Sequence, residues 1–331
     1  MDTTTTTTTG SAMVTLGAAT LASFGDVLES ARAFAAESVA PRTREAYADQ
    51  WRTFAAWCEA QGVVALPASA ATLAAYLADR AERCAWKPAS IGLALVAIRT
   101  AHKAAGVEHA TSHPAVVATM KGIRRTLGTA QRRAAPVVVD ELRAMVDALP
   151  ADSLGAVRDR ALLVCGMAGA LRRSELVGLD VSDVTETADG LVLTIRRAKT
   201  DQEAQGTRIG LPYGNTAATC PVRALRAWRD ASGVTDGALF RAVDRHGHVG
   251  ERLHAADVAR VVKRAAGRAG LDAARYSGHS LRAGLATSAA RAGRSDRASM
   301  AQGRWSSRAM VDRYVREGSM FRENAAAGIG L

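Results

Sequence analysis

The stretch SGHSLRAG, residues 277–284, is the part of the sequence on which the assignment of fold and site depends. It places His279 and Arg282 three residues apart. In an α-helix this spacing aligns two side chains on one face, where both could donate hydrogen bonds to a single phosphate. The same pair arises often by chance, so its meaning depends on the motifs on either side.

Downstream, the stretch QGRWSSRAMVDRYVR, residues 302–316, supplies Trp305 and, nine residues later, Tyr314. The apolar residues Val311 and Val315 lie at helical spacing around the tyrosine, which predicts an amphipathic helix. A single tyrosine in such a helix usually serves packing. Beside several cations, however, its hydroxyl could act as a nucleophile toward a phosphodiester.

Upstream, the stretch GALRRSELVGL, residues 169–179, places Arg172 at the start of an amphipathic turn and Glu175 one turn later. A carboxylate at this distance can orient a guanidinium or a neighbouring histidine. Arg173 is expected to point elsewhere, toward the surface or a DNA backbone, because adjacent side chains diverge on a helix. Together the three motifs supply a nucleophile and the cations that metal-free cleavage of a phosphodiester requires.

The charge of the chain indicates a polyanionic partner. Lysine and arginine total 43 against 32 aspartate and glutamate residues, a formal charge of +11, which favours nucleic acid. No acidic residue occurs between Glu108 and Asp140. The basic residues of this segment are Lys121, Arg124, Arg125, Arg132 and Arg133. We expect them to neutralise phosphates of a DNA duplex, with a solvated linker as the alternative.

The composition also bounds the class of protein. Hydrophobic residues make up 48% of the chain but form no run of the roughly 18 residues that a membrane span needs, so a soluble protein is expected. The threonine run at residues 3–9 lacks the features of a secretory signal, which predicts a cytoplasmic location. The four cysteines, expected to be reduced thiols in the core, are Cys58, Cys84, Cys165 and Cys220.

A length of 331 residues predicts two globular units joined by a linker. We expect a disordered low-complexity tail at 1–22, an all-helical domain at 23–127, a basic linker at 128–136, an α+β domain at 137–316 and a C-terminal segment at 317–331. The predicted fold class is mainly α, with a small antiparallel β-sheet in the C-terminal domain.

Apolar residues recur at helical spacing in four segments of the first domain, which start near Pro41, behind Ser69, at Pro88 and after Pro114. The span before Pro41 has room for one short helix. His102 lies on the apolar stripe of the third segment, and we interpret it as a packed core residue rather than a ligand.

In the second domain, helices are expected at about 140–149 and 153–169. The stretch LVLTI at 191–195 alternates as a strand does, and TRIGLP at 207–212 resumes an extended pattern. Lys199 is therefore expected at or near the tip of a hairpin. Helices are expected to dominate from there to the end.

The ordered motifs resemble those of the tyrosine recombinase, or phage integrase, family, and most closely its Cre recombinase branch. The resemblance covers roughly residues 136–325. It implies a catalytic triad of Arg172, His279 and Arg282, with Tyr314 as the nucleophile. It also implies that Glu175 is the acidic partner and Lys199 the hairpin lysine. Most relatives carry a second histidine where this chain has Trp305, whereas Cre-like members carry tryptophan at the same spacing. An indole can only donate, so Trp305 could hold a phosphate oxygen or pack the site.

The resemblance further implies a 3′-phosphotyrosyl intermediate, a Holliday junction and a homotetramer on two DNA duplexes that carry a specific, inverted-repeat site. It implies a bacterial, phage or plasmid origin. Lys87 resembles a DNA-facing position of Cre-like proteins, and segment 317–331 is expected to dock on a neighbouring protomer, with packing in cis as the alternative. The glycines form no phosphate-gripping loop, so neither nucleotide, metal nor other cofactor is expected.

Two other functions stay open at this point. A type IB topoisomerase would use similar phosphotyrosine chemistry to relax one duplex as a monomer, and an architectural DNA-binding protein would have lost catalysis. The spacing of Trp305 and the apolar residues after Tyr314 count against the first, and the intact residue set counts against the second. We therefore expect a site-specific recombinase for integration, excision or resolution, without an additional arm-binding module.

Overall fold

The structure, a computed structural model, describes residues 24–130, 133–196, 206–320, 324 and 326. The expected tail at 1–22, Arg132 and Lys199 lie outside the described residues. Contacts divide the chain into two compact units, Met1–Gln131 and Arg132–Leu331. This division falls within the segment 128–136 that was expected to be a linker.

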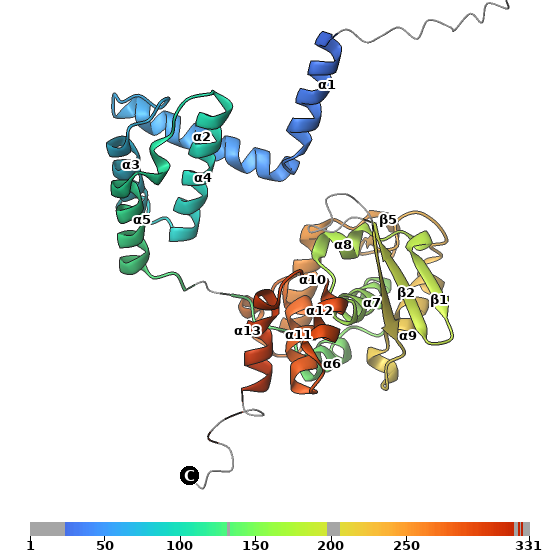
Figure 1. Ribbon diagram of the computed structural model, residues 1–331. Helices are drawn as coiled ribbons and strands as arrows, with labels where there is room; N and C mark the ends of the chain where they lie inside the picture. Colours follow the sequence, from blue (N-terminus) through green and yellow to red (C-terminus); the bar gives the residue numbers. More distant parts are fainter. Residues whose placement is uncertain (1–23, 131–132, 197–205, 321–323, 325, 327–331) are drawn as a thin grey trace, which may run out of the picture. The chain divides into compact units, whose positions relative to one another are not determined.

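The first unit is built from helices (Figure 1). They are α1 (Phe24–Glu37), α2 (Pro41–Ala60), α3 (Ala70–Glu82), α4 (Pro88–Ala104), the 3-10 helix η1 (Ala110–Ser112) and α5 (Pro114–Leu127). Three of them begin at proline, whose missing N–H costs no helical hydrogen bond there. Ser69 caps α3 by accepting the N–H of Thr72. The four helical segments predicted from the sequence are confirmed as α2 to α5.

The core of this unit is aromatic and aliphatic. Phe54 of α2 packs edge-on against Tyr76 of α3, with ring centroids 4.9 Å apart. His102 is fully buried. Its Nδ1 atom donates to the carbonyl of Ile98 at 2.8 Å, and its Nε2 atom accepts the N–H of Ala68 at 2.9 Å. The prediction that His102 is a core residue is confirmed.

The second unit combines helices with two small antiparallel sheets (Figure 1). Its elements are α6 (Val139–Asp147), α7 (Leu154–Ala168), α8 (Arg173–Gly178), η2 (Val181–Asp183), β1 (Val184–Thr187), β2 (Gly190–Ile195), β3 (Thr207–Pro212), η3 (Ala217–Thr219), α9 (Pro221–Ser232), β4 (Arg241–Val243), β5 (Val249–Arg252), α10 (Ala255–Arg268), η4 (Ala273–Arg275), α11 (Ser280–Arg291), α12 (Asp296–Gly303) and α13 (Arg308–Ser319). The predicted fold class, mainly α with a small antiparallel sheet, is confirmed.

The larger sheet has the order β1-β2-β3, with β2 in the centre. Leu193 of β2 pairs with Val184 of β1 and with Ile209 of β3. The predicted β2–β3 hairpin is present, with Ile195 opposite Thr207 beside the connector that contains Lys199. Helices dominate the rest of the chain, as predicted, but β4 and β5 form a second hairpin that the sequence did not predict. These strands have three and four residues, none of them buried, so they are too short to show the alternation that marks a half-buried strand.

Helix α7 is buried along most of its length and packs against α9 and α11. Figure 1 shows the β1–β2–β3 sheet at one side of this unit and α11, α12 and α13 at the other. Trp228 of α9 is fully buried, and its indole N–H donates to the carbonyl of Leu239 at 2.8 Å. Helix α7 thus packs between α9, which contacts β2 and β3, and α11.

All four cysteines are free thiols, as predicted. Cys58, Cys165 and Cys220 are buried, and burial raises the pKa of Cys165 to about 12. The prediction of a core position was wrong for Cys84, which is exposed just beyond the end of α3. Among the described helices, none combines the length and the apolar character needed to cross a membrane.

Candidate active site

The ends of short helices in the second unit position the candidate residues. Arg172 immediately precedes α8, and Glu175 lies in the first turn of that helix. His279 immediately precedes α11, and Arg282 lies in its first turn. Tyr314 lies within α13, which packs along α11. Residues that are far apart in the sequence therefore meet where α11 faces the start of α8 and α13.

Trp305 and Tyr314 belong to a small apolar cluster at this meeting point. Its buried members are Ala170, Ala283, Ala286, Trp305, Val311 and Tyr314. The rings of Trp305 and Tyr314 have centroids 6.3 Å apart and planes tilted by 42°. A Cβ atom at Gly303 would lie 1.9 Å from the Trp305 ring, so only glycine fits there. The indole is thus held against the tyrosine by close backbone packing.

The hydroxyl of Tyr314 lies 3.2 Å from the Nε2 atom of His279. Partial desolvation, followed by the charges of Arg282, Arg172 and Arg173, lowers the pKa of His279 below its ordinary value. A lowered pKa leaves the imidazole neutral at neutral pH. A neutral imidazole at this distance is able to accept the phenolic proton.

Arg282 is almost entirely buried, at 1% exposure. Its Nη1 atom donates to the carbonyl of Ala170 at 2.5 Å, and its Cζ atom lies 4.4 Å from the centre of the Trp305 ring. Its Nη2 atom is buried and has no hydrogen-bond partner in the described part of the chain. Burial, followed by repulsion from Arg172, lowers the pKa of Arg282 to about 10, so it stays cationic at neutral pH. An anion would satisfy this unpartnered donor.

Glu175 is a buried carboxylate that links two arginines. One oxygen accepts from the guanidinium of Arg172, and the other accepts the backbone N–H of Arg172 at 2.9 Å. The Nη2 atom of Arg304 donates to the second oxygen at 2.8 Å. Burial raises the pKa of Glu175, but the Arg172 N–H and the charge of Arg304 outweigh it, so the pKa is lowered. Glu175 therefore remains an anion and fixes the direction of Arg172.

Arg304 was missed by the sequence reasoning, which treated it only as the residue between Gly303 and Trp305. Its side chain is 6% exposed and contacts the residues that precede α8. The only signal in the sequence was its position next to Trp305. Because α12 and the start of α8 are far apart along the chain, no local pattern predicts their contact.

Arg173 is exposed, as expected, but it lies nearer to the site than predicted. Its stem packs on Gly278, where an added Cβ atom would lie 2.4 Å from Cδ of Arg173. This packing explains why the charge of Arg173 acts on the neighbouring His279. The other described candidates for DNA binding are all exposed, namely Lys87, Lys121, Arg124, Arg125 and Arg133.

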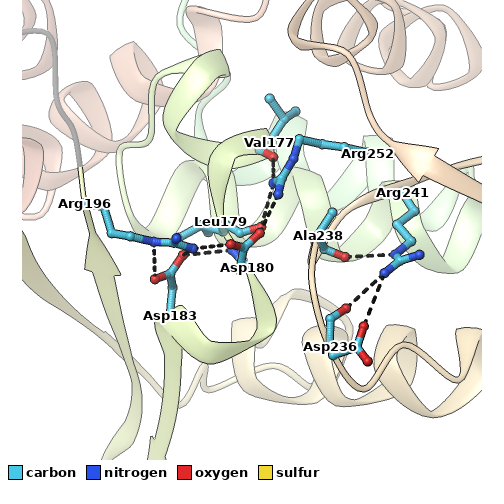
Figure 2. A network of polar contacts seen from close by, with 9 residues as sticks. All are labelled: Val177, Leu179, Asp180, Asp183, Arg196, Asp236, Ala238, Arg241 and Arg252. Carbon is cyan, nitrogen blue, oxygen red and sulfur yellow. Dashed lines mark hydrogen bonds and ion pairs between the residues drawn. The ribbon is translucent and has the colours of Figure 1, made fainter.

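A second polar cluster lies beyond the other end of α8 (Figure 2). We call it the Asp180 cluster, and its members are Asp180, Asp183, Arg196 and Arg252. The Nε atom of Arg196 donates to Asp183 at 2.7 Å. Arg252 donates to Asp180 at 2.5 Å and to the carbonyl of Val177 at 2.8 Å. The cluster ties β2 and β5 to the segment that carries Arg172 and Glu175.

Within the described residues, no group of three or more histidine, cysteine, aspartate or glutamate side chains is placed to hold a metal ion.

Comparisons with known proteins identify the family. The phage integrase family matches residues 137–319. The chain is 38% identical over 293 residues to an integrase/recombinase xerD homolog of Selenomonas ruminantium, covering 87% of this chain and 85% of that protein. It is 26% identical over 292 residues to recombinase Cre of Escherichia phage P1, covering 80% and 81%. Its fold is similar to that of the Tn1549 transposon integrase in complex with transposon right end DNA, with a TM-score of 0.61, 13% identity and coverage of 89% and 98%.

The chain belongs to the phage integrase family, the tyrosine recombinases. It is a site-specific recombinase, which confirms the family and the enzyme class predicted from the sequence over the topoisomerase and architectural alternatives. The narrower prediction placed the chain closest to Cre. Identity to the xerD homolog, at 38%, exceeds identity to Cre, at 26%. Cre is thus the more distant of these two relatives. The tryptophan at position 305 was not sufficient to assign the chain to the Cre branch.

Proposed function

We propose that this recombinase cuts and rejoins DNA through Tyr314, with a 3′-phosphotyrosine as the covalent intermediate. The observation that carries the proposal is the 3.2 Å contact between the Tyr314 hydroxyl and Nε2 of His279. A phenol has an ordinary pKa near 10 and needs a proton acceptor and nearby cations to attack at neutral pH. His279 offers the acceptor, and the buried guanidinium of Arg282 offers a cation whose Nη2 atom has no partner among the described residues.

In the cleavage step, Arg172 and Arg282 donate to the non-bridging oxygens of the scissile phosphate and stabilise the charge that develops there. The Tyr314 oxygen attacks phosphorus while His279 takes the phenolic proton. The bond between phosphorus and the 5′ oxygen breaks, and Lys199 protonates this leaving oxygen. The role of Lys199 stays a prediction from the sequence, since that residue lies outside the described residues.

In the rejoining step, the 5′ hydroxyl of a partner duplex gives its proton to Lys199 and attacks the phosphotyrosine. The bond between phosphorus and the Tyr314 oxygen breaks, and His279 returns a proton to the phenol. One exchange of strands gives a Holliday junction, and a second exchange resolves it. Each step replaces one phosphodiester by another. The reaction therefore consumes no nucleotide.

We infer that the partner is duplex DNA with an inverted-repeat site, bound by four protomers. The formal charge of +11 and the exposed basic face of α5 support a polyanionic partner. The Tn1549 integrase of similar fold was solved with DNA. Segment 317–331 is proposed to dock on a neighbouring protomer. Met320, which follows α13, is 55% exposed, whereas Phe321 and Ile329 lie outside the described residues.

A nicked suicide duplex tests the nucleophile. The DNA site is first obtained by selecting bound duplexes from random DNA, and the nick then lets the cleaved end diffuse away so that the covalent adduct accumulates. The wild-type protein is expected to form the adduct, and Tyr314→Phe is expected to bind the duplex without forming it. Tyr276→Phe is a matched control, because it changes another buried tyrosine of the same unit. Adduct formation by Tyr314→Phe would show that another residue is the nucleophile.

The assembly is tested separately. Removal of residues 321–331 is expected to leave adduct formation on a single duplex intact and to abolish recombination between two duplexes. The mass of the wild-type complex on two duplexes should correspond to four protomers. Full recombination by the truncated protein would contradict docking on a neighbour.

A further inference from the structure

Arg304 adopts a backbone conformation that few residues of its type adopt. It follows the last residue of α12 with φ 54° and ψ 46°, in the left-handed region. Among the described residues, the other non-glycine residues with positive φ are Ala85 and Ala170. A side chain is disfavoured in this region, and such strain persists only where surrounding contacts compensate for it. Two of the three strained residues, Ala170 and Arg304, meet at the active site.

The contacts of the Arg304 side chain supply this compensation. Its guanidinium donates to Oε2 of Glu175 at 2.8 Å. It also donates to the carbonyls of Gly169 at 3.1 Å, Ala170 at 3.2 Å and Gln302 at 2.9 Å. With 6% of the side chain exposed, Arg304 has little surface to offer to DNA. Its two Nη atoms are engaged within the protein, so they hold other residues in place.

These contacts connect Arg304 to both arginines of the site. The Glu175 carboxylate that Arg304 holds also accepts from the guanidinium of Arg172. The Ala170 carbonyl that Arg304 contacts also accepts from Nη1 of Arg282. A single guanidinium thus fixes the two acceptors that set the directions of Arg172 and Arg282. Without it, Oε2 of Glu175 would keep only the backbone N–H of Arg172 as a donor, and the carboxylate would be held less firmly.

We propose that Arg304 is a positioning residue for strand cleavage, which acts through Glu175 and the Ala170 carbonyl to hold Arg172 and Arg282 toward the scissile phosphate. The inference rests on the proposed function, because it assumes that these two arginines bind the phosphate. Its place in the fold, at the end of α12 and next to Trp305, couples that helix to the turn before α8. The left-handed backbone is needed to turn the side chain inward at this point.

The first test replaces Arg304 with glycine, which keeps the left-handed backbone unstrained and removes the guanidinium. Arg304→Gly is expected to slow single-turnover adduct formation at saturating DNA by about 10–100-fold with little change in Kd, by analogy with the loss of a supporting contact to a metal ligand. Ala85→Gly is a matched control, because Ala85 is also left-handed but lies in the first unit. A rate equal to that of the control would overturn the proposal.

A double-mutant cycle separates positioning from a general structural role. If Arg304 acts through Glu175, the rate losses of Arg304→Gly and Glu175→Gln combine to clearly less than their product. Losses that multiply would overturn the proposal. If Arg304→Gly does not fold, the cycle is made with Arg304→Lys, which keeps the charge but loses the forked donors. Arg297→Gln removes the same charge from an exposed position of α12 and is expected to cleave normally at saturating DNA.

Failure of this inference is distinguishable from failure of the proposed function. If Tyr314 is not the nucleophile, Tyr314→Phe still forms the adduct. If Arg304 has no positioning role, adduct formation still requires Tyr314. In that case the rate of Arg304→Gly equals that of the Ala85→Gly control, or its loss multiplies with that of Glu175→Gln.

Discussion

Two polar clusters lie at opposite ends of the segment around α8, and they differ in their balance of charge. The Asp180 cluster pairs two arginines with two aspartates. The Glu175 cluster places three arginines around one glutamate, and its members are Arg172, Glu175, Arg282 and Arg304. The first cluster is partly exposed, whereas Glu175 and Arg282 are buried.

The two clusters also differ in whether the charges and hydrogen-bond donors within them are balanced. In the Glu175 cluster, Nη2 of Arg282 and Nε of Arg304 are buried without a partner among the described residues. Burial lowers the pKa of both guanidinium groups, which means that the protein destabilises their charged forms. Such an excess of buried positive charge costs free energy unless an anion joins it. We propose that the Asp180 cluster stabilises the fold and that the Glu175 cluster receives the phosphate of the DNA.

The largest expected effect comes from Arg282→Met, which removes a cation of the unbalanced cluster and roughly keeps its volume. Adduct formation is expected to fall about 10²–10³-fold, because one donor to the developing charge is lost. The free energy of unfolding is expected to stay equal or to increase, because a buried charge with an unpartnered donor is removed. Suicide-duplex kinetics and urea unfolding measure the two quantities. Normal cleavage together with a lower free energy of unfolding would show that Arg282 serves the stability of the fold rather than cleavage.

In the balanced cluster, Asp183→Asn is expected to lower the free energy of unfolding by about 2 kcal/mol, because the charge-assisted hydrogen bonds from Arg196 are weakened. Cleavage at a temperature where the variant is folded should change little. The control is Asp189→Asn, an exposed aspartate of the β1–β2 turn, for which urea unfolding should give a change within about 0.5 kcal/mol. Equal free energies of unfolding for the two variants would show that the Asp180 cluster does not stabilise the fold.

Outside both clusters, Lys121→Gln is expected to weaken DNA binding a little and to reduce the slope of log affinity against log salt by about 1, because one phosphate contact is lost. Binding measured at several salt concentrations checks this. Lys103→Gln, which changes another exposed lysine of the first unit, should leave the slope unchanged. A slope that does not respond to Lys121→Gln would remove α5 from the DNA interface.

The smallest expected effect is a shift in pH dependence with Arg173→Gln. The Arg173 charge helps to lower the pKa of His279, so its removal should raise that pKa toward the ordinary value. Since the proposed proton acceptor is the neutral imidazole, cleavage is lost as the pH falls through the pKa of His279. The variant should therefore lose activity at a higher pH than the wild type. An NMR titration of His279 in the free protein measures the shift, and Arg268→Gln, in the last turn of α10, is the control.

Local patterns predicted the helices well and the small strands poorly. Helices α2 to α5 carry apolar residues at helical spacing and begin at proline or behind a serine cap, and both signals are read within one segment. Strands β4 and β5 are only three and four residues long and pair with each other, so neither carries a signal of its own. Cys84 was placed in the core because its type is often buried, but it lies just beyond the end of α3.

The candidate site was predicted as a set of residues but not as an arrangement. The order of Arg172, His279, Arg282, Trp305 and Tyr314 was sufficient to identify the family, and these residues meet in the structure. The sequence could not predict that Arg173 packs on Gly278, because the contact joins α8 to the turn before α11. It also gave undue weight to Trp305 in choosing the Cre branch.

The sequence by itself determined the helical segments, the β2–β3 hairpin, the family and the residue types available for phosphoryl transfer, because spacing along the chain carries this information. Only the tertiary structure decided which charges meet. Arg304 and Glu175 are 129 residues apart, and their contact depends on a left-handed residue at the end of α12 and on the packing of α12 beside the turn before α8. The excess of positive charge beside Tyr314 arises from that packing, since no single motif contains all three arginines.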